Sequence, residues 1–164
     1  MARISFKNQS EYYLKLQELE TLAAKDETLE KAVVAGAKVV ADKIRSNLES
    51  LPTEKFRYLP EGERRNGLTP QELGDLSASF GLAPIQRENG YVNTKAGFDG
   101  YGGHPTKKYP NGVPNALIAR SAENGSSIRN KTPFVRPAVN ASRQKAIKEM
   151  EEVIDDEMKK IFGG

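Results

Sequence analysis

The sequence predicts an α+β protein, in which helices near both ends of the chain pack with a small, mainly antiparallel sheet. Two observations predict this fold. Apolar residues recur with the helical period before residue 50 and again after residue 137. Between these stretches, Asn89-Gly90 joins two segments of strand character, which is the strongest short signal for a β-hairpin. The length of 164 residues suits one compact body, so we expect residues 1–164 to form a single domain.

Two N-terminal helices are predicted, after a short strand or loose arm at residues 1–9. The first helix is expected to begin at Ser10, whose side chain suits an N-cap. The second is expected to begin at Asp26 and to end near Ser50, just before Pro52. The apolar residues of the first helix recur at steps of four, three and four: Tyr12, Leu16, Leu19 and Ala23.

The second of these helices is predicted to be the central packing element. Its middle, residues 32–37, is small and apolar, so another backbone can approach it closely. Its apolar face keeps the helical step throughout and is widened by three more small or branched residues. These residues are Leu29, Val33, Gly36, Val40, Ile44 and Leu48, with Val34, Ala37 and Ala41 beside them.

Two segments, 52–75 and 97–115, contain several Gly and Pro residues and show no apolar periodicity. We predict that both are long mobile loops. Between them, the arms of the hairpin are expected at about 79–87 and 91–98. Residues 116–121 are short and apolar, and they are predicted to form a further strand.

Two prolines bracket a predicted corner before the last helix. Pro133 favours an extended conformation before it, and Pro137 suits the first turn of a helix. We therefore predict a short extended segment at 133–136. Within it, Phe134 is expected to anchor the corner in the core, and Arg136 to face outward or to pair with a carboxylate.

A long C-terminal helix is predicted over about 137–162. Its apolar residues form one narrow stripe, and the rest of its surface is charged. Such a helix covers a sheet or another helix on one side only, so we expect it to pack on the sheet. The stripe comprises Val139, Ile147, Met150, Ile154, Met158 and Ile161.

The sequence offers few residues for catalysis or metal binding. It has no cysteine and one histidine, His104, which excludes thiolate chemistry and sites with several histidines. His104 would be the sole base of a Ser/His/Asp triad, and its segment lacks a nucleophile-elbow pattern. The glycines at 97–103 precede prolines instead of a helix, so they do not suit phosphate binding. The acidic run at 149–157 suits a solvated helix face or weak binding of a divalent cation. We expect no catalytic, cofactor-binding or metal-binding residues.

The net charge is +3, from 25 basic and 22 acidic residues, which is too balanced to imply nucleic acid by itself. Two basic clusters lie on the predicted loops: Arg64-Arg65, and Lys107-Lys108 beside Tyr109. They can pair with an acidic partner protein or touch a DNA backbone. No stretch approaches the length of a transmembrane helix, so we expect no membrane partner.

Two motifs flank the predicted sheet and the last helix. The first is Gly74-Asp75-Leu76-Ser77-Ala78-Ser79, and the second is Pro133-Phe134-Val135-Arg136-Pro137-Ala138. In this order they resemble the Gly-x-Leu-x-x-Ser and Pro-Phe-Leu-Arg-Pro-Ala motifs of the tail-completion (head–tail joining) proteins of long-tailed bacteriophages and prophages. The resemblance covers about residues 28–160. The chain departs from that family's Glu-Phe-Gly-Thr motif, because Ala122-Glu123-Asn124-Gly125-Ser126 stands in its place.

The resemblance implies a structural subunit of the virion and not an enzyme. It implies a ring of copies, expected to be a hexamer, around a channel through which DNA passes without sequence-specific contact. The implied partners are head connector or stopper proteins on one side and tail-tube or tail-terminator proteins on the other. The implied location is the virion, and the host bacterial cytoplasm during assembly. Residues expected to contact partners are Arg64, Arg65, Tyr101, Lys107, Lys108, Tyr109 and Arg136.

Two other functions stay open from the sequence. The basic loops and a sequence pI near 9.0 also suit a small nucleic-acid-binding accessory protein of a phage or prophage. Such a protein would bind duplex DNA with an affinity that falls steeply with salt. A small enzyme is the third possibility, and it would use His104 or the acidic run of the last helix as its site.

Overall fold

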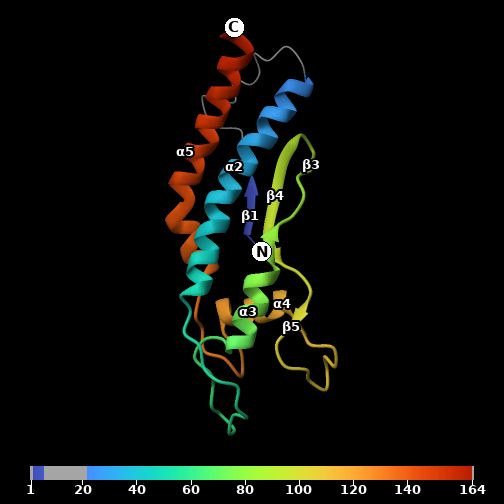
Figure 1. Ribbon diagram of the computed structural model, residues 1–164, viewed down its shortest axis with the longest axis vertical. Helices are drawn as coiled ribbons and strands as arrows, with labels where there is room; N and C mark the ends of the chain where they lie inside the picture. The colour runs from blue at the N-terminus through green and yellow to red at the C-terminus, as the bar shows by residue number, and fades with distance from the viewer. Residues whose placement is uncertain (1, 6–21, 164) are drawn as a thin grey trace. The chain divides into compact units, whose positions relative to one another are not determined.

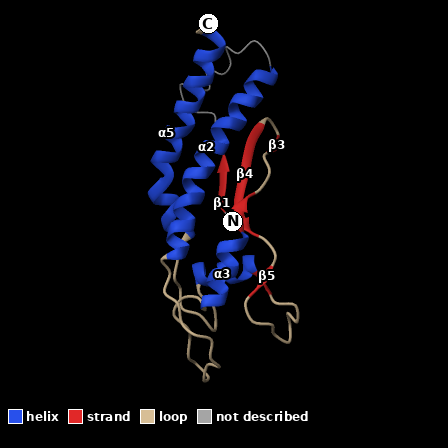
Figure 2. Cartoon of the chain, viewed as in Figure 1, coloured by secondary structure: helices blue, strands red, loops and turns tan. Residues whose placement is uncertain are grey.

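The computed structural model describes residues 2–5 and 22–163 and has an α+β fold with a small antiparallel sheet and a long C-terminal helix packed on it (Figures 1 and 2). The helices are α2 (Leu22–Glu49), α3 (Pro70–Ser79), α4 (Asn115–Asn124) and α5 (Val135–Phe162). The strands are β1 (Ala2–Ser5), β2 (Phe80–Leu82), β3 (Gln86–Glu88), β4 (Tyr91–Phe98), β5 (Tyr101–Gly102) and β6 (Val113–Pro114).

The chain folds into two compact units, neither of which is a continuous stretch of sequence. Unit 1 comprises Met1–Ala41, Leu82–Ala96 and Ser142–Gly164. Unit 2 comprises Asp42–Gly81 and Gly97–Ala141. The single domain expected over residues 1–164 stays a prediction.

The main sheet has the strand order β1-β4-β2, and β3 also pairs with β4. The hairpin at Asn89-Gly90 is confirmed, because β3 and β4 pair antiparallel up to Glu88 and Tyr91. Asn89 and Gly90 have φ values of 52° and 78°, the left-handed conformation that a two-residue hairpin turn requires. The arm expected at 79–87 is interrupted between β2 and β3. Pro84 lies in this interruption and has no N–H to give to a strand partner.

In unit 1, α2 and α5 lie side by side, and their facing side chains share one core with the sheet (Figure 1). The central members of this core are Val33 of α2, Val92 of β4, and Met150 and Ile154 of α5. A Cβ atom on Gly36 would lie 2.6 Å from the Met150 side chain and 3.2 Å from the Ala146 carbonyl oxygen. The close approach predicted for the small middle of this helix is therefore confirmed, and the approaching element is α5.

Most of the apolar face predicted for α2 is confirmed, because Val33, Val40, Ile44 and Leu48 are all buried, whereas Leu29 and Val34 are half-buried. The predicted start at Asp26 is wrong. The helix begins at Leu22, so Asp26 and Thr28, which is 1% exposed, both lie within it. The helix expected to begin at Ser10 lies mostly outside the described residues, as does its capping residue.

The stripe predicted for α5 is right at Met150 and Ile154 and wrong at two other positions. Ile147 and Ile161 are 41% and 45% exposed. The buried residues recur every four positions and include small and polar side chains, which a search for large apolar residues overlooks. They are Ala138, Ser142, Ala146, Met150 and Ile154.

Unit 2 contains α3, α4, the end of α2 and the start of α5, around a core centred on Phe134. Phe134 is fully buried, and its ring lies 6.0 Å from that of Phe98, which in turn lies 5.1 Å from that of Phe80. Aromatic pairs at these separations add to the stability gained by burial. Leu68 and Leu76 are also fully buried in this unit.

Three segments of unit 2 differ from the sequence predictions. Residues 116–121 belong to helix α4 and do not form a strand, because Ile118, Ala119 and Ala122 are buried at helical spacing in a segment of strong helix formers. The segment 52–75 is not a loop throughout, since α3 begins at Pro70. Within 97–115, β5 pairs with β6. The mobility of the remaining loop residues stays a prediction.

A further correction concerns the corner. Helix α5 begins at Val135, so the extended segment expected at 133–136 ends two residues earlier than predicted. Pro137 therefore lies in the first turn of the helix, as predicted. The first N–H groups of a helix have no partner within it, so proline costs no hydrogen bond at this position.

We predict that Gly36→Leu lowers the free energy of unfolding by about 1–3 kcal/mol, because the added side chain overpacks the contact with Met150 and Ala146. Leucine forms helices far better than glycine, so helix propensity opposes this loss. Lys38→Leu, at an exposed position of the same helix, is the matched control. Urea denaturation followed by circular dichroism measures both, and equal stability of the two variants would contradict the close packing.

Candidate partner-binding surface

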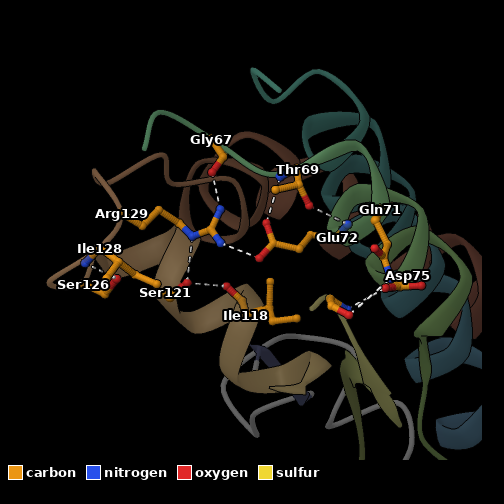
Figure 3. Close-up of polar contacts among 11 residues, drawn as sticks. Gly67, Thr69, Gln71, Glu72, Asp75, Ile118, Ser121, Ser126, Ile128 and Arg129 are labelled. Atoms are coloured by element: carbon orange, nitrogen blue, oxygen red, sulfur yellow. Dashed lines mark hydrogen bonds and ion pairs between the residues drawn. The ribbon is translucent and has the colours of Figure 1, made fainter. Parts of the chain in front are cut away.

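A buried ion pair joins Arg129 and Glu72 in unit 2 (Figure 3). The Arg129 Nη2 donates to Glu72 Oε1 at 2.7 Å, and the two side chains are 3% and 10% exposed. The other two guanidinium nitrogens also donate, Nη1 to the Gly67 carbonyl and Nε to Ser121 Oγ at 3.0 Å. A buried charge is tolerated when it is paired and hydrogen-bonded, and each of the three Arg129 nitrogens has an acceptor.

The same Glu72 caps the start of α3. Its Oε2 accepts from the Thr69 backbone N–H at 2.8 Å, and the Thr69 hydroxyl accepts from the Glu72 N–H at 3.1 Å. This reciprocal arrangement is a capping box, and Pro70 occupies the first helical position. One carboxylate thus fixes the start of α3 and holds Arg129.

Helix α3 also fixes the start of the segment 103–112. Asp75 Oδ2 accepts from the Gly103 backbone N–H at 2.7 Å. Gln71 Nε2 donates to the Gly103 carbonyl at 3.2 Å. The N–H and the carbonyl of Gly103 are therefore held by two α3 side chains that lie one helical turn apart.

The backbone around Arg65 is held by the segment that carries Arg129. The Arg65 N–H donates to the Ile128 carbonyl at 3.0 Å, and the Asn130 N–H donates to the Arg65 carbonyl at 2.8 Å. The Asn130 side chain adds a hydrogen bond of 2.7 Å to Asn66 Oδ1. These bonds connect the end of segment 53–68 to Ile128 and Asn130, the two residues that flank Arg129 in the chain.

A stack of rings joins segment 53–68 to segment 103–112. The rings of Phe56 and His104 have centroids 3.8 Å apart, and the Arg65 guanidinium carbon lies 4.9 Å from the Phe56 centroid. Tyr58 meets Phe56 edge-on at 5.7 Å and is itself 91% exposed. Tyr58 is therefore highly exposed while its ring contacts Phe56, which packs against His104 and Arg65. We call Phe56, Tyr58, Arg65 and His104 the aromatic stack.

Two carboxylates of segment 53–68, those of Glu54 and Glu63, are engaged locally. Arg57 donates to Glu54 Oε1 at 2.8 Å and to Glu63 Oε2 at 2.9 Å. The Asn66 backbone N–H also donates to Glu54, at 3.1 Å. This N–H and then Arg57 hold the pKa of the Glu54 carboxyl below its ordinary value of 4.5.

The corner before α5 is capped by a residue from α4. The Glu123 carboxylate accepts from the backbone N–H groups of Phe134, Val135 and Arg136 at 2.7, 2.8 and 2.9 Å. Negative charge is favourable at a helix N-terminus, where these donors have no other partner. The Phe134 carbonyl accepts from Asn47 Nδ2 at 3.2 Å, so the corner is held from two sides.

The structure places most of the predicted contact residues on the outside of unit 2. Tyr101 is 67% exposed. Arg65 differs, because it is 8% exposed and contacts the Phe56 ring, so it supports the aromatic stack. Tyr109 is half-buried, with Lys108 Nζ 5.4 Å from its ring centroid. The other predicted contact residues are exposed: Arg64, Lys107, Lys108 and Arg136. Contact with a partner stays a prediction for all of them.

At the corner, the structure buries Phe134 completely and leaves Pro133 and Pro137 exposed. The buried ring has the position expected of a corner anchor. The Arg136 side chain is exposed, and its backbone N–H is the group that meets a carboxylate.

Sequence reasoning missed Phe56, Tyr58, Arg129 and the two glutamates at positions 72 and 123. Thr69-Pro70-Gln71-Glu72 does contain the capping-box pattern with proline at the first helical position, which would have revealed α3 and one role of Glu72. Nothing local marks Arg129, because its carboxylate partner is 57 positions away in the sequence.

Within residues 2–5 and 22–163, no group of three or more His, Cys, Asp or Glu residues could hold a metal ion. In the same part of the chain, no helix has the length and apolar character needed to cross a membrane.

The chain matches no known family model, and comparisons with curated proteins and with solved structures found no significant match.

We predict that Arg129→Met lowers the free energy of unfolding by about 3–5 kcal/mol, because it leaves the Glu72 carboxylate buried without its cation. Adding Glu72→Gln should restore part of the loss, since the amide oxygen can still accept from Thr69 without carrying charge. Lys148→Met is the control, because the Lys148–Glu152 pair is 3.7 Å apart and solvent-exposed, and such pairs contribute at most about 1 kcal/mol. Urea denaturation measures all three, and equal losses for the two Met variants would refute a buried pair.

We expect Glu123→Ala to lower the free energy of unfolding by about 1–2 kcal/mol, because three N–H groups at the start of α5 lose their acceptor. Asn124→Ala changes the neighbouring exposed residue and should have an effect within about 0.5 kcal/mol. Thermal unfolding measures both variants. Unchanged stability of Glu123→Ala would show that the cap contributes nothing.

The Glu54 pKa predicts an acid-dependent change in segment 53–68. Because the folded pKa is lowered, the stabilisation is present above pH 4.5 and is lost as the pH falls through the folded pKa. In an NMR titration, the Asn66 amide shift should change with a midpoint below 4.5. Glu54→Gln should abolish the titration, and a midpoint at or above 4.5 in the unmodified protein would contradict the hydrogen bonds.

Proposed function

We propose that the protein is a structural subunit of a tailed-phage or prophage virion that joins the tail to the head connector. The observation that carries this proposal is the order of the two motifs, Gly74–Ser79 and Pro133–Ala138, which resembles that of tail-completion proteins. In this proposal the protein acts by binding other proteins and catalyses no reaction.

The geometry of the second motif supports a mechanical role. The Phe134 ring is fully buried, its carbonyl accepts from Asn47, and Glu123 caps the three N–H groups that follow. The motif is therefore a well-packed, hydrogen-bonded corner at the start of α5. A subunit that transmits load between two assemblies needs corners of this kind, because loosely packed ones open locally at low free-energy cost.

Unit 2 also provides side chains suited to partner contact. Tyr58 and Tyr101 are 91% and 67% exposed, and tyrosine and arginine contribute a disproportionate share of binding energy at protein interfaces. We propose a ring of copies, with six as the expected number, around the DNA channel. Its faces would dock to connector or stopper proteins and to tail-tube or tail-terminator proteins, in the virion and, before that, in the host cytoplasm.

Deleting the gene in the phage or prophage that carries it, followed by electron microscopy of the particles, tests this proposal. We expect DNA-filled heads beside unattached tails. Wild-type protein supplied from a plasmid should restore joined virions, and Tyr101→Ala should restore fewer. Lys38→Gln, on α2, is the control and should restore them fully. Joined virions in the deletion strain would overturn the proposal.

A further inference from the structure

The positive charge of the protein is unevenly distributed along its two units. Unit 2 holds 12 of the 25 Lys and Arg residues and 9 of the 22 Asp and Glu residues, which leaves 13 of each in unit 1. The whole net charge of +3 therefore belongs to unit 2. A charge excess confined to one part of a molecule favours a partner of the opposite sign there.

Most carboxylates of unit 2 are already engaged within it. Glu54 and Glu63 both hold Arg57, Glu72 holds Arg129, and Glu123 caps α5. Two exposed cations, Lys55 and Arg64, adjoin the aromatic stack in sequence, and they have no ion pair among the residues that the structure describes. Their charge is available to a ligand.

Two further cations belong to the same end of unit 2. Segments 53–68 and 103–112 both extend beyond α3 and α4 (Figure 1), and the 3.8 Å contact between Phe56 and His104 joins them. Lys107 and Lys108 are exposed at the tip of a turn closed by hydrogen bonds of 3.0 and 3.1 Å between Thr106 and Tyr109. The loop-tip surface, as we call it, comprises Lys55, Phe56, Tyr58, Arg64, Lys107 and Lys108.

We propose that the loop-tip surface binds the phosphate backbone of a nucleic acid. Cations spaced along two loops can follow a line of phosphates, each contact releasing condensed counterions. The exposed rings add a second feature, because aromatic side chains between cations are the combination that binds nucleic-acid strands without sequence preference. An acidic protein offers carboxylates but no flat bases for Tyr58, which is 91% exposed. This inference rests on charge and ring geometry and does not depend on the proposed role in the virion.

Fluorescence anisotropy with the purified full-length protein and labelled 20-nucleotide duplex or single-stranded DNA tests the proposal. The test variant changes Lys55, Arg64, Lys107 and Lys108 to Gln. For duplex binding, removing one cation that touches a phosphate should make the slope of log K against log salt less negative by about 0.9. Removing four such cations should abolish about a 100-fold affinity change between 50 and 200 mM salt. The control removes the same charge from unit 1, by changing Lys38, Arg143, Lys145 and Lys148 to Gln, and should keep the wild-type slope.

Two further measurements distinguish a nucleic acid from an acidic protein as the partner. Tyr58→Ala should weaken single-strand binding about tenfold and leave duplex binding within twofold if the ring stacks on a base. Poly-glutamate at equal charge should compete poorly, and equal competition would assign the surface to an acidic protein and overturn the proposal. Equal losses of affinity in the two Gln variants, with circular dichroism showing both folded, would also overturn it. Because no virion is involved, failure here is distinguishable from failure of the head–tail role.

Discussion

The buried ion pair between Arg129 and Glu72 is the constraint on which the rest of unit 2 depends. Two charges removed from water are tolerated only with good geometry and with every remaining donor satisfied. To satisfy Arg129, the chain must bring the Gly67 carbonyl and the Ser121 hydroxyl to the same place. To satisfy Glu72, it must form the capping box at the start of α3. The need to satisfy this one ion pair therefore positions three elements of unit 2: segment 53–68, α3 and α4.

A chain of contacts connects the buried Arg129–Glu72 pair to the exposed aromatic stack. The backbone next to Arg129 pairs with Arg65, whose guanidinium lies against Phe56, which contacts His104. Helix α3 holds Gly103 from the other side through Asp75 and Gln71. Binding residues on loops work best when a rigid scaffold positions them, because less conformational freedom is lost when a partner binds. The loop-tip surface has that support, which links its proposed function to the fold.

The parts of the fold that could be predicted from the sequence are those whose signals are local. Asn89-Gly90 specifies its turn through backbone conformation alone, and the periodicity of α2 and α5 extends over many turns. The strand expected at 116–121 is a helix, because a stretch of six residues is too short to distinguish the two periods and the surrounding core favours helix. Most of the candidate site could not be predicted from the sequence, because Phe56 and Arg129 contact residues that are far away in the sequence.

We conclude that the Arg129–Glu72 pair holds the loops of unit 2 in place, and hydrogen exchange measures this effect at the amides concerned. Mass spectrometry of the wild-type protein and of Glu72→Gln would follow the amides of 63–68, 103 and 128–130, with those of the β3–β4 hairpin as the reference. We predict faster exchange in the first group and unchanged exchange in the hairpin. Unchanged exchange in segment 63–68, or equal acceleration in the hairpin, would contradict the claim.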